Sequence, residues 1–144
     1  MKRLLIVMCM LCFSSLAGFA PQQKVLYILQ AEPIRPYEKI WLAVCKVESN
    51  FNPYAIGDVH LKNKSYGMVQ IRQVRLDDYY QQTGIRYNTK QMFDTVRSKS
   101  VFMFYATQYR PDEIEKISRC WNGGVKGMKK RSTKPYYQKI LLSL

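Results

Sequence analysis

An apolar stripe that leads up to an acidic residue is the feature that most constrains how this chain can fold. The apolar residues Ile40, Val44, Val47 and Phe51 recur at steps of three and four residues, which is the spacing of one face of an α-helix. The Asn-Pro pair at 52–53 should end this helix, because the residue before a proline disfavours helical backbone. The sequence therefore predicts a helix over about residues 37–50 with one face against the core.

Glu48 falls on the stripe beside this apolar face, together with Trp41 and Cys45. It is therefore predicted to lie at the edge of buried surface. Partial removal from water disfavours the ionised form of a carboxyl group and raises its pKa. A carboxyl that keeps its proton at neutral pH can act as a general acid. Glu48 is thus the candidate catalytic residue.

The N-terminus has the three-part order of a secretory signal peptide. A basic start is followed by an apolar run over residues 4–13 and then by small residues. The run is shorter than the roughly 20 residues of a permanent membrane span, so a cleaved leader is favoured over a retained signal anchor. Cleavage after Ala20 or after Ala17 fits the pattern. We expect a signal peptide over 1–20 and one exported domain over 21–144, without a permanent membrane span.

The charge of the chain restricts its partners. Loss of Lys2 and Arg3 with the leader lowers the formal net charge from +13 to +11. The composition, 47% hydrophobic and 13% aromatic, is typical of a folded domain rather than a disordered basic tail. Such a charge favours polyanions. Because the protein is predicted to be exported to the periplasm or cell wall, we expect wall polymers or anionic lipid surfaces and no nucleic acid.

Helical spacing recurs along the rest of the chain and predicts a mainly α fold. Glycines at the expected ends support this, because glycine commonly follows a helix. Further helices are predicted over about residues 69–82, 88–109, 111–122 and from 135 onward, with a polar loop over 52–65. In the last helix Tyr136, Ile140 and Leu141 should turn inward, whereas Asp77 and Asp78 should face solvent.

Cys45 and Cys120 are the two cysteines that remain after the leader is removed. In an exported protein such a pair is readily interpreted as a disulfide. Two buried free thiols are the alternative. A structural zinc site needs four ligands, and beyond these two cysteines the chain offers only His60. No metal or other cofactor is therefore expected.

Four short motifs follow one another along the chain. They are ESNFNP at 48–53, SYGMVQI at 65–71, CWNGG at 120–124 and TKPY at 133–136. In this order they resemble the motifs of the lytic transglycosylases of the lysozyme-like SLT family. The resemblance covers almost the whole mature chain, so it is far more specific than a lone Glu-Ser pair.

The resemblance implies a lysozyme-like helical fold with a substrate groove and Glu48 as the catalytic acid. Gly67 would let the backbone approach the sugar, and Gln70 would bond an N-acetyl group or a hydroxyl. In the third motif Trp121 replaces a tyrosine and Cys120 replaces an alanine, which suggests a Cys45–Cys120 bridge. The aromatic residues Tyr66, Trp121 and Tyr136 are candidate sugar platforms and neighbours of Glu48. The implied substrate-binding residues are Ser49, Ser65, Tyr66, Gly67, Gln70, Trp121, Asn122 and Tyr136.

The implied substrate is peptidoglycan, cleaved between N-acetylmuramic acid and N-acetylglucosamine. If no second carboxylate reaches Glu48, the N-acetyl oxygen of the muramic acid must assist, and its 6-hydroxyl then closes a 1,6-anhydro ring. Two alternatives remain open. A goose-type lysozyme would use a carboxylate such as Asp58 to position water. A noncatalytic cationic protein would only bind the wall.

A basic cluster lies between the third and fourth motifs and consists of Lys126, Lys129, Lys130, Arg131 and Lys134. It would guide the protein to an anionic glycan-peptide network, or it is an ordinary solvated loop. The small size and the leader are typical of wall-opening enzymes that accompany secretion or conjugation machinery or phage lysis, an analogy at the level of the fold.

Overall fold

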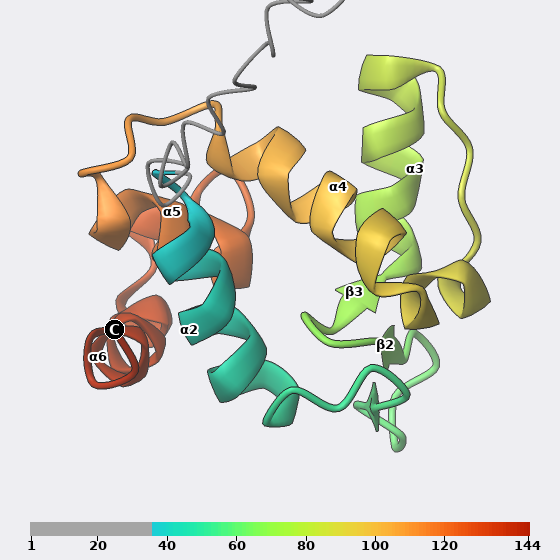
Figure 1. Cartoon of the computed structure of the whole chain (residues 1–144), viewed down its shortest axis with the longest axis horizontal. Helices are drawn as coiled ribbons and strands as arrows, with labels where there is room; N and C mark the ends of the chain where they lie inside the picture. Colours follow the sequence, from blue (N-terminus) through green and yellow to red (C-terminus); the bar gives the residue numbers. More distant parts are fainter. Residues whose placement is uncertain (1–35) are drawn as a thin grey trace, which may run out of the picture. The chain divides into compact units, whose positions relative to one another are not determined.

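The computed structural model describes residues 36–144, so the expected signal peptide over 1–20 lies outside the described part of the chain. Helices dominate this part, joined by three short 3-10 turns and one small sheet (Figure 1). A mainly α fold, as the sequence predicts, is confirmed. The α-helices are α2 (Glu38–Ser49), α3 (Gln73–Thr83), α4 (Thr95–Ala106), α5 (Ile114–Gly123) and α6 (Lys134–Leu141).

Helix α2 matches the predicted helix over about 37–50 and ends as the sequence suggests. Ile40 and Val44 of its apolar stripe are buried and Val47 is half-buried. Phe51 lies beyond the helix end and is 44% exposed, so the prediction that it belongs to the buried stripe is wrong. Asn50 adopts a left-handed conformation with φ 51°, and its N–H bonds the carbonyl groups of Cys45 and Lys46. Asparagine is one of the few residues that tolerate this cap. The cap ends α2 at Ser49 and places Glu48 in its last turn.

A three-stranded antiparallel sheet lies where the sequence predicts a polar loop and the start of a helix. Its strands, in spatial order, are β1 (Ile56–Gly57), β2 (Ser65–Tyr66) and β3 (Ile71–Arg72). Strands of two residues leave too little alternation to detect in a sequence. The helix predicted from residue 69 begins only at Gln73, because Gln70 is left-handed with φ 55° and interrupts the helical path. Its predicted end before Gly84 is confirmed.

The helix predicted over 88–109 is two elements. The 3-10 turn η1 (Thr89–Phe93) is closed by a capping box, in which Asn88 and Gln91 each bond the backbone N–H of the other. Asp94 then takes an extended conformation, and its side chain accepts from the N–H groups of Val96 and Arg97 at the start of α4. These side-chain bonds satisfy the free N–H groups at the starts of η1 and α4. A continuous helix would have no free N–H groups at the start of α4.

The segment between α5 and α6 is held by a buried arginine. Arg119 on α5 donates to Glu115 Oε1 (2.6 Å), Thr133 Oγ1 (3.0 Å) and the Met128 carbonyl (2.8 Å). These bonds pin the turns η2 (Gly127–Lys129) and η3 (Arg131–Thr133) against α5. Helix α6 follows directly and packs against both α5 and α2. Arg119 thus helps to set the approach of α6 to α2.

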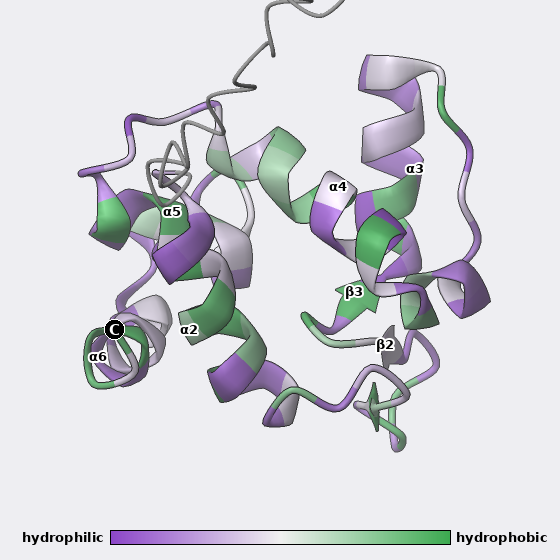
Figure 2. Ribbon diagram, in the orientation of Figure 1, coloured by the Kyte–Doolittle hydropathy of each residue, from purple (hydrophilic) through white to green (hydrophobic). Residues whose placement is uncertain are grey.

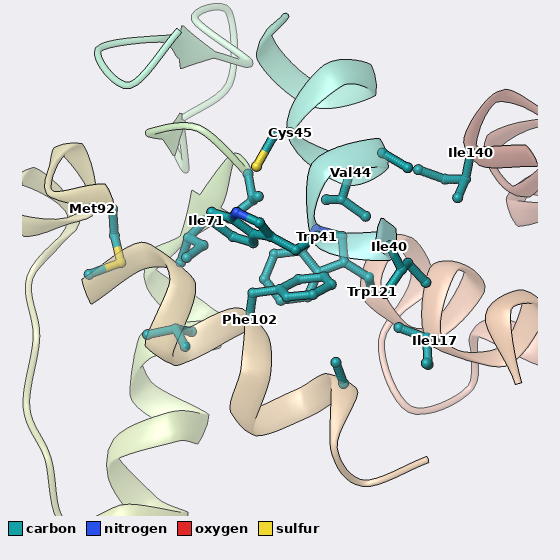
Figure 3. Packing of buried hydrophobic residues seen from close by; sticks show 14 of the residues in the cluster. Ile40, Trp41, Val44, Cys45, Ile71, Met92, Phe102, Ile117, Trp121 and Ile140 are labelled. Carbon is teal, nitrogen blue, oxygen red and sulfur yellow. The ribbon is translucent and has the colours of Figure 1, made fainter. Parts of the chain in front are cut away.

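The core lies where α2, α4 and α5 meet. The Phe102 ring lies 5.3 Å from the Trp41 ring and 5.0 Å from the Trp121 ring, centroid to centroid (Figure 3). Apolar residues, green in Figure 2, are concentrated in the middle of α2 and along α4. From α6, Ile140 is fully buried as predicted, but Leu141 is 46% exposed, so the prediction that it turns inward is wrong.

Within residues 36–144, no helix combines the length and the apolar character that crossing a membrane requires.

Candidate active site

A cleft of about 740 Å³ opens between the end of α2, the sheet, α3, α4 and α5. Five of the nine residues that the sequence assigned to catalysis or substrate binding line it, namely Glu48, Ser65, Gln70, Trp121 and Asn122. A cleft of this volume that gathers a candidate acid and several polar groups is the usual form of a ligand site.

Burial of Glu48 raises its pKa to about 7. The hydrogen bond from Tyr136 opposes this rise, the negative charge of Asp58 adds to it, and the charges of Arg72 and Arg75 lower the pKa again. Desolvation is the dominant cause because the ionised carboxylate loses the water that would stabilise it. Near neutral pH a large share of the protein therefore carries a neutral, proton-donating Glu48.

Tyr136 lies behind Glu48 rather than in the cleft. Its hydroxyl donates to Glu48 Oε1 at 2.9 Å, although the two residues are 88 positions apart. Burial also raises the pKa of Tyr136 well above its ordinary range, so it stays a donor. Since Oε1 accepts this bond, Oε2 is the oxygen that can carry the acidic proton. The prediction that Tyr136 is a neighbour of Glu48 is confirmed, whereas its assignment to substrate binding stays a prediction.

Ser65 belongs to a polar cluster on the sheet. Its hydroxyl lies 2.9 Å from Asp58 Oδ2 and 2.7 Å from Gln70 Oε1. Arg72 donates to the same Asp58 oxygen through Nε (3.1 Å) and Nη2 (2.6 Å). The hydrogen bond from Arg72 lowers the pKa of Asp58. Asp58 is thus an ionised second carboxylate that lines the cleft, with its charge compensated by Arg72.

The side-chain amide of Gln70 forms hydrogen bonds within the protein. Its Nε2 donates to the carbonyl of Gly67 (2.8 Å) and to that of Ala55 (3.3 Å). The expected bond to an N-acetyl group would have to displace these contacts. A Cβ on Gly57, which the sequence did not single out, would collide with Gln70 Oε1. The missing side chain of Gly57 therefore leaves the space that Gln70 occupies in the part of the cleft formed by the sheet.

Three other predicted substrate residues do not line the cleft. Ser49 donates to the Met68 carbonyl at 2.8 Å and ties the end of α2 to the loop before β3. Tyr66 packs its ring against Phe93, with centroids 5.9 Å apart. Gly67 has φ 77°, and a Cβ there would collide with the Met92 carbonyl. Glycine is thus required at 67 for a close approach to η1, not to a sugar.

Trp121 is mainly a core residue with one edge at the cleft. It is 6% exposed and packs on Phe102 and Tyr105. The expected role as a sugar platform is therefore restricted to that edge. Asn122, the next residue, is exposed and lines the cleft. Its amide is available to a ligand as the sequence suggested.

Both cysteines are buried free thiols, so the structure does not contain the Cys45–Cys120 bridge that the sequence suggests. Cys120 lies beside the Tyr109 side chain, which shares a hydrogen bond with it. Cys45 is fully buried in α2, and this burial raises its pKa to about 12. Each thiol has its own packing environment, which is the alternative that the sequence left open.

Sequence reasoning missed a cationic and aromatic wall of the cleft. It is formed by Arg75 and Asp78 on α3 and by Tyr105 on α4. Asp78, which the sequence placed in solvent, accepts from the Tyr105 hydroxyl at 2.6 Å. The signal was weak because α3 is polar on most of its surface, so its inward residues do not form an apolar stripe.

Among residues 36–144, no group of three or more His, Cys, Asp or Glu side chains is arranged to hold a metal ion. The chemistry that the described residues offer is acid–base chemistry. Glu48 supplies a proton near neutral pH, Tyr136 orients it, and Asp58 holds a fixed negative charge. This arrangement suits cleavage of a bond whose leaving atom must be protonated.

Comparisons with known proteins show the fold and the family of the chain. A chain in the crystal structure of Aeromonas hydrophila PliI in complex with Meretrix lusoria lysozyme superposes with a TM-score of 0.57 at 21% identity. The match covers 72% of this chain and 86% of that chain, which supports the lysozyme-like fold. A search among curated proteins found no match. The family model described as transglycosylase SLT domain matches residues 30–134. The chain therefore belongs to the transglycosylase SLT domain family.

Proposed function

We propose that this protein is a peptidoglycan lytic transglycosylase with Glu48 as its single catalytic acid and base. Membership of the SLT family supports a transglycosylase-type action on peptidoglycan. The observation that carries the proposal is the state of Glu48, whose pKa is raised to about 7 in a cleft and whose Oε1 is held by Tyr136. An acid with this pKa can donate a proton and then take one back at the same pH.

The first half of the reaction breaks the glycosidic bond. Glu48 Oε2 gives its proton to the oxygen that links N-acetylmuramic acid to N-acetylglucosamine, and that oxygen leaves with the bonding electrons. The N-acetyl carbonyl oxygen of the muramic acid attacks its own anomeric carbon and forms a cyclic oxazolinium ion. This internal assistance replaces the second carboxylate that most glycosidases use.

The second half forms the product without consuming water. Glu48, now ionised, removes the proton from the 6-hydroxyl of the same sugar. The 6-oxygen attacks the anomeric carbon and displaces the acetamido oxygen, which closes the 1,6-anhydro ring. Glu48 is protonated again, so one residue completes the cycle.

One observation favours a second candidate, hydrolysis of the goose-lysozyme type. Asp58 is an ionised carboxylate on the cleft wall and could orient a water molecule. However, its Oδ2 already accepts from Arg72 and Ser65, which compensates its charge and restricts its movement. We therefore propose that the N-acetyl group of the substrate, and not Asp58, stabilises the positive charge at the anomeric carbon.

The test is digestion of purified sacculi by the mature protein, with released muropeptides identified by mass spectrometry. Glu48→Gln should abolish release because the amide cannot donate an acidic proton. Asp58→Asn is the matched variant, because it also replaces a cleft carboxyl by its amide. Under the proposed mechanism Asp58→Asn keeps anhydro ends at a rate within about tenfold of wild type.

Three other outcomes would contradict the proposal. Reducing ends that disappear in Asp58→Asn would make the protein a lysozyme. Retention of full activity in Glu48→Gln would exclude Glu48 as the acid. Binding to sacculi without any release would favour a noncatalytic wall-binding protein, the third class that the sequence allows.

We also propose export, with the periplasm or cell wall as the site of action, on the basis of the leader-like residues 1–20. The exposed basic cluster, Lys126 to Lys134, would hold the protein on the anionic wall. Action beside a secretion, conjugation or phage assembly is part of the same proposal and rests on an analogy at the level of the fold. Detection of the mature protein in periplasmic extracts, or its absence there, tests the location.

A further inference from the structure

Arg75 is a cation of the cleft that the reaction proposed above does not use. It lies in the first turns of α3 and lines the same cleft as Glu48. One nitrogen, Nη2, donates to the Trp121 main-chain carbonyl at 2.7 Å. The guanidinium carbon lies 4.3 Å from the centre of the Trp121 ring and 4.7 Å from that of Tyr105. Both distances are in the range of cation–π contacts, so the two rings and the carbonyl bond restrict the position of the guanidinium group.

No carboxylate of residues 36–144 forms a salt bridge with Arg75. The two acids that follow Arg75 on α3 have other partners, since Asp77 accepts from Gln73 (2.8 Å) and Asp78 accepts from Tyr105 (2.6 Å) and Gln82 (2.8 Å). Glu48 must be neutral to act as an acid. A largely buried arginine is rarely left without an anionic partner. The fold thus places in the cleft a guanidinium group that is close to acidic groups but forms a salt bridge with no carboxylate of residues 36–144, so it can accept an anionic group of a ligand.

The substrate can supply this partner. A guanidinium group prefers a carboxylate, which it can bind through two parallel hydrogen bonds. The group that distinguishes muramic acid from glucosamine is the lactyl ether on the ring that Glu48 cleaves. Its carboxyl is an anion where the stem peptide has been removed and a neutral amide where the peptide is attached. The lactyl carboxylate therefore lies on the correct sugar to reach Arg75 beside Glu48.

We infer that Arg75, stacked on Trp121, binds the lactyl carboxylate of peptide-free muramic acid and so directs the enzyme to glycan strands that have lost their stem peptides. This inference rests on the proposed function and adds the substrate class to it. The class of reaction that must supply such strands is hydrolysis of the amide bond between the lactyl carboxyl and the stem peptide.

The test compares three ligands of one glycan length by calorimetry with the Glu48→Gln protein, which retains Arg75 and cannot turn over the ligand. The first ligand carries free lactyl carboxylates, the second carries lactyl carboxamides and the third carries stem peptides. A charge-assisted bond to the first should make it bind about tenfold more tightly than the second. The affinity of the first ligand should also exceed that of the ligand with stem peptides, because the carboxylates of that ligand lie on the peptide and not on the lactyl group.

Arg75→Gln in the same background should remove the difference between carboxylate and carboxamide. The control is Arg86→Gln, which also removes a guanidinium stacked on a tyrosine, 4.2 Å from the Tyr80 ring, but away from this cleft. It should keep the difference. Equal affinity of the carboxylate and carboxamide ligands for the protein with Arg75 intact would overturn the inference. This outcome does not depend on whether Arg75→Gln folds. Tightest binding of the peptide-bearing ligand would also overturn it.

Turnover by the wild-type protein separates this inference from the proposed function. Anhydro products formed equally well from all three ligands would leave the lytic activity in place and refute the role of Arg75. Carboxylate-dependent binding without any cleavage by the wild type would support the role of Arg75 and refute the lytic activity. With both correct, the free-carboxylate glycan has the lower KM by about tenfold, and Arg75→Gln raises that KM with a smaller effect on kcat.

Discussion

At the scale of single residues, the function depends on how the surroundings of Glu48 set its proton affinity. Its position in the last turn of α2 leaves it half-buried, and desolvation raises its pKa to about 7. Tyr136 holds one carboxyl oxygen and leaves the other for the leaving group. Two predictions follow from this pair of contacts.

Replacement of Glu48 should stabilise the protein at high pH. The folded protein binds the Glu48 proton more tightly than the unfolded chain, whose pKa is near the ordinary value of 4.5. The contribution of this group to stability is thus fully present below the ordinary value and is lost as the pH rises through about 7. Glu48→Gln should exceed the wild-type free energy of unfolding by about 2–3 kcal/mol at about pH 8, with allowance for partial exposure, and match it at about pH 4. Urea unfolding at both pH values measures this, and equal stability at the higher pH contradicts it.

Tyr136→Phe should move the pH profile of the enzyme. The Tyr136 hydrogen bond lowers the pKa of Glu48, so its loss raises that pKa further. Activity that requires neutral Glu48 falls above its pKa, so the alkaline limb of kcat/KM should shift upward by about one unit. The rate should fall about tenfold or more because the carboxyl loses its orientation. Tyr137→Phe, on the same helix but outside the contact with Glu48, is the control. An unshifted limb would show that Tyr136 does not act on Glu48.

At the scale of elements, the cleft depends on short junctions that hold the sheet against its neighbours. Gly67 lets β2 and the following turn approach η1, because its N–H bonds the Ala55 carbonyl and its missing Cβ leaves room for the Met92 carbonyl. Ser49 ties α2 to the same turn. The sheet is therefore held by backbone contacts, which give no pattern of residue types in the sequence.

Substitution of two glycines separates two causes of lost stability, a steric clash of the added Cβ and the strain of a positive φ. Gly67 and Gly84 both have positive φ, 77° and 74°, but a Cβ would collide with Met92 at 67 and meets nothing within 4 Å at 84. Gly84→Ala should cost about 1–2 kcal/mol of stability from conformation alone. Gly67→Ala should cost at least about 2 kcal/mol more because the turn must move away from η1. Thermal and urea unfolding of both variants measures the difference, and similar losses would show that the contact with Met92 relaxes freely.

At the scale of the whole molecule, charge and cleft are arranged for a large anionic substrate. The basic cluster between α5 and α6 is exposed, and one member, Lys130, also lines the cleft. Arg119 anchors this segment from the inside through Thr133 and the Met128 carbonyl. The same segment therefore presents positive charge and carries α6, with Tyr136, to the catalytic helix.

Neutralising the basic cluster should weaken wall binding in a salt-dependent way. Glutamine at its five positions should lower affinity for sacculi about tenfold at low ionic strength, and the difference should fade toward about 1 M salt as the charges are screened. The control neutralises five other exposed cations, Lys62, Lys64, Arg86, Lys90 and Lys139. Cosedimentation over a salt series compares the two variants. Equal loss in both would mean that total charge, and not this cluster, controls binding.

The amino-acid sequence alone determined the mainly α class, the helix that ends next to Glu48, the end of α3 and the order of the family motifs, but not the break between η1 and α4 or the start of α3. These depend on neighbouring residues, through apolar spacing and capping by Asn50 and Gly84. Only the tertiary structure decided the pKa of Glu48, the free state of Cys45 and Cys120 and the stacking of Arg75 on Trp121. Each of these depends on groups far apart in the chain, because desolvation and directed contacts arise only where packed elements meet.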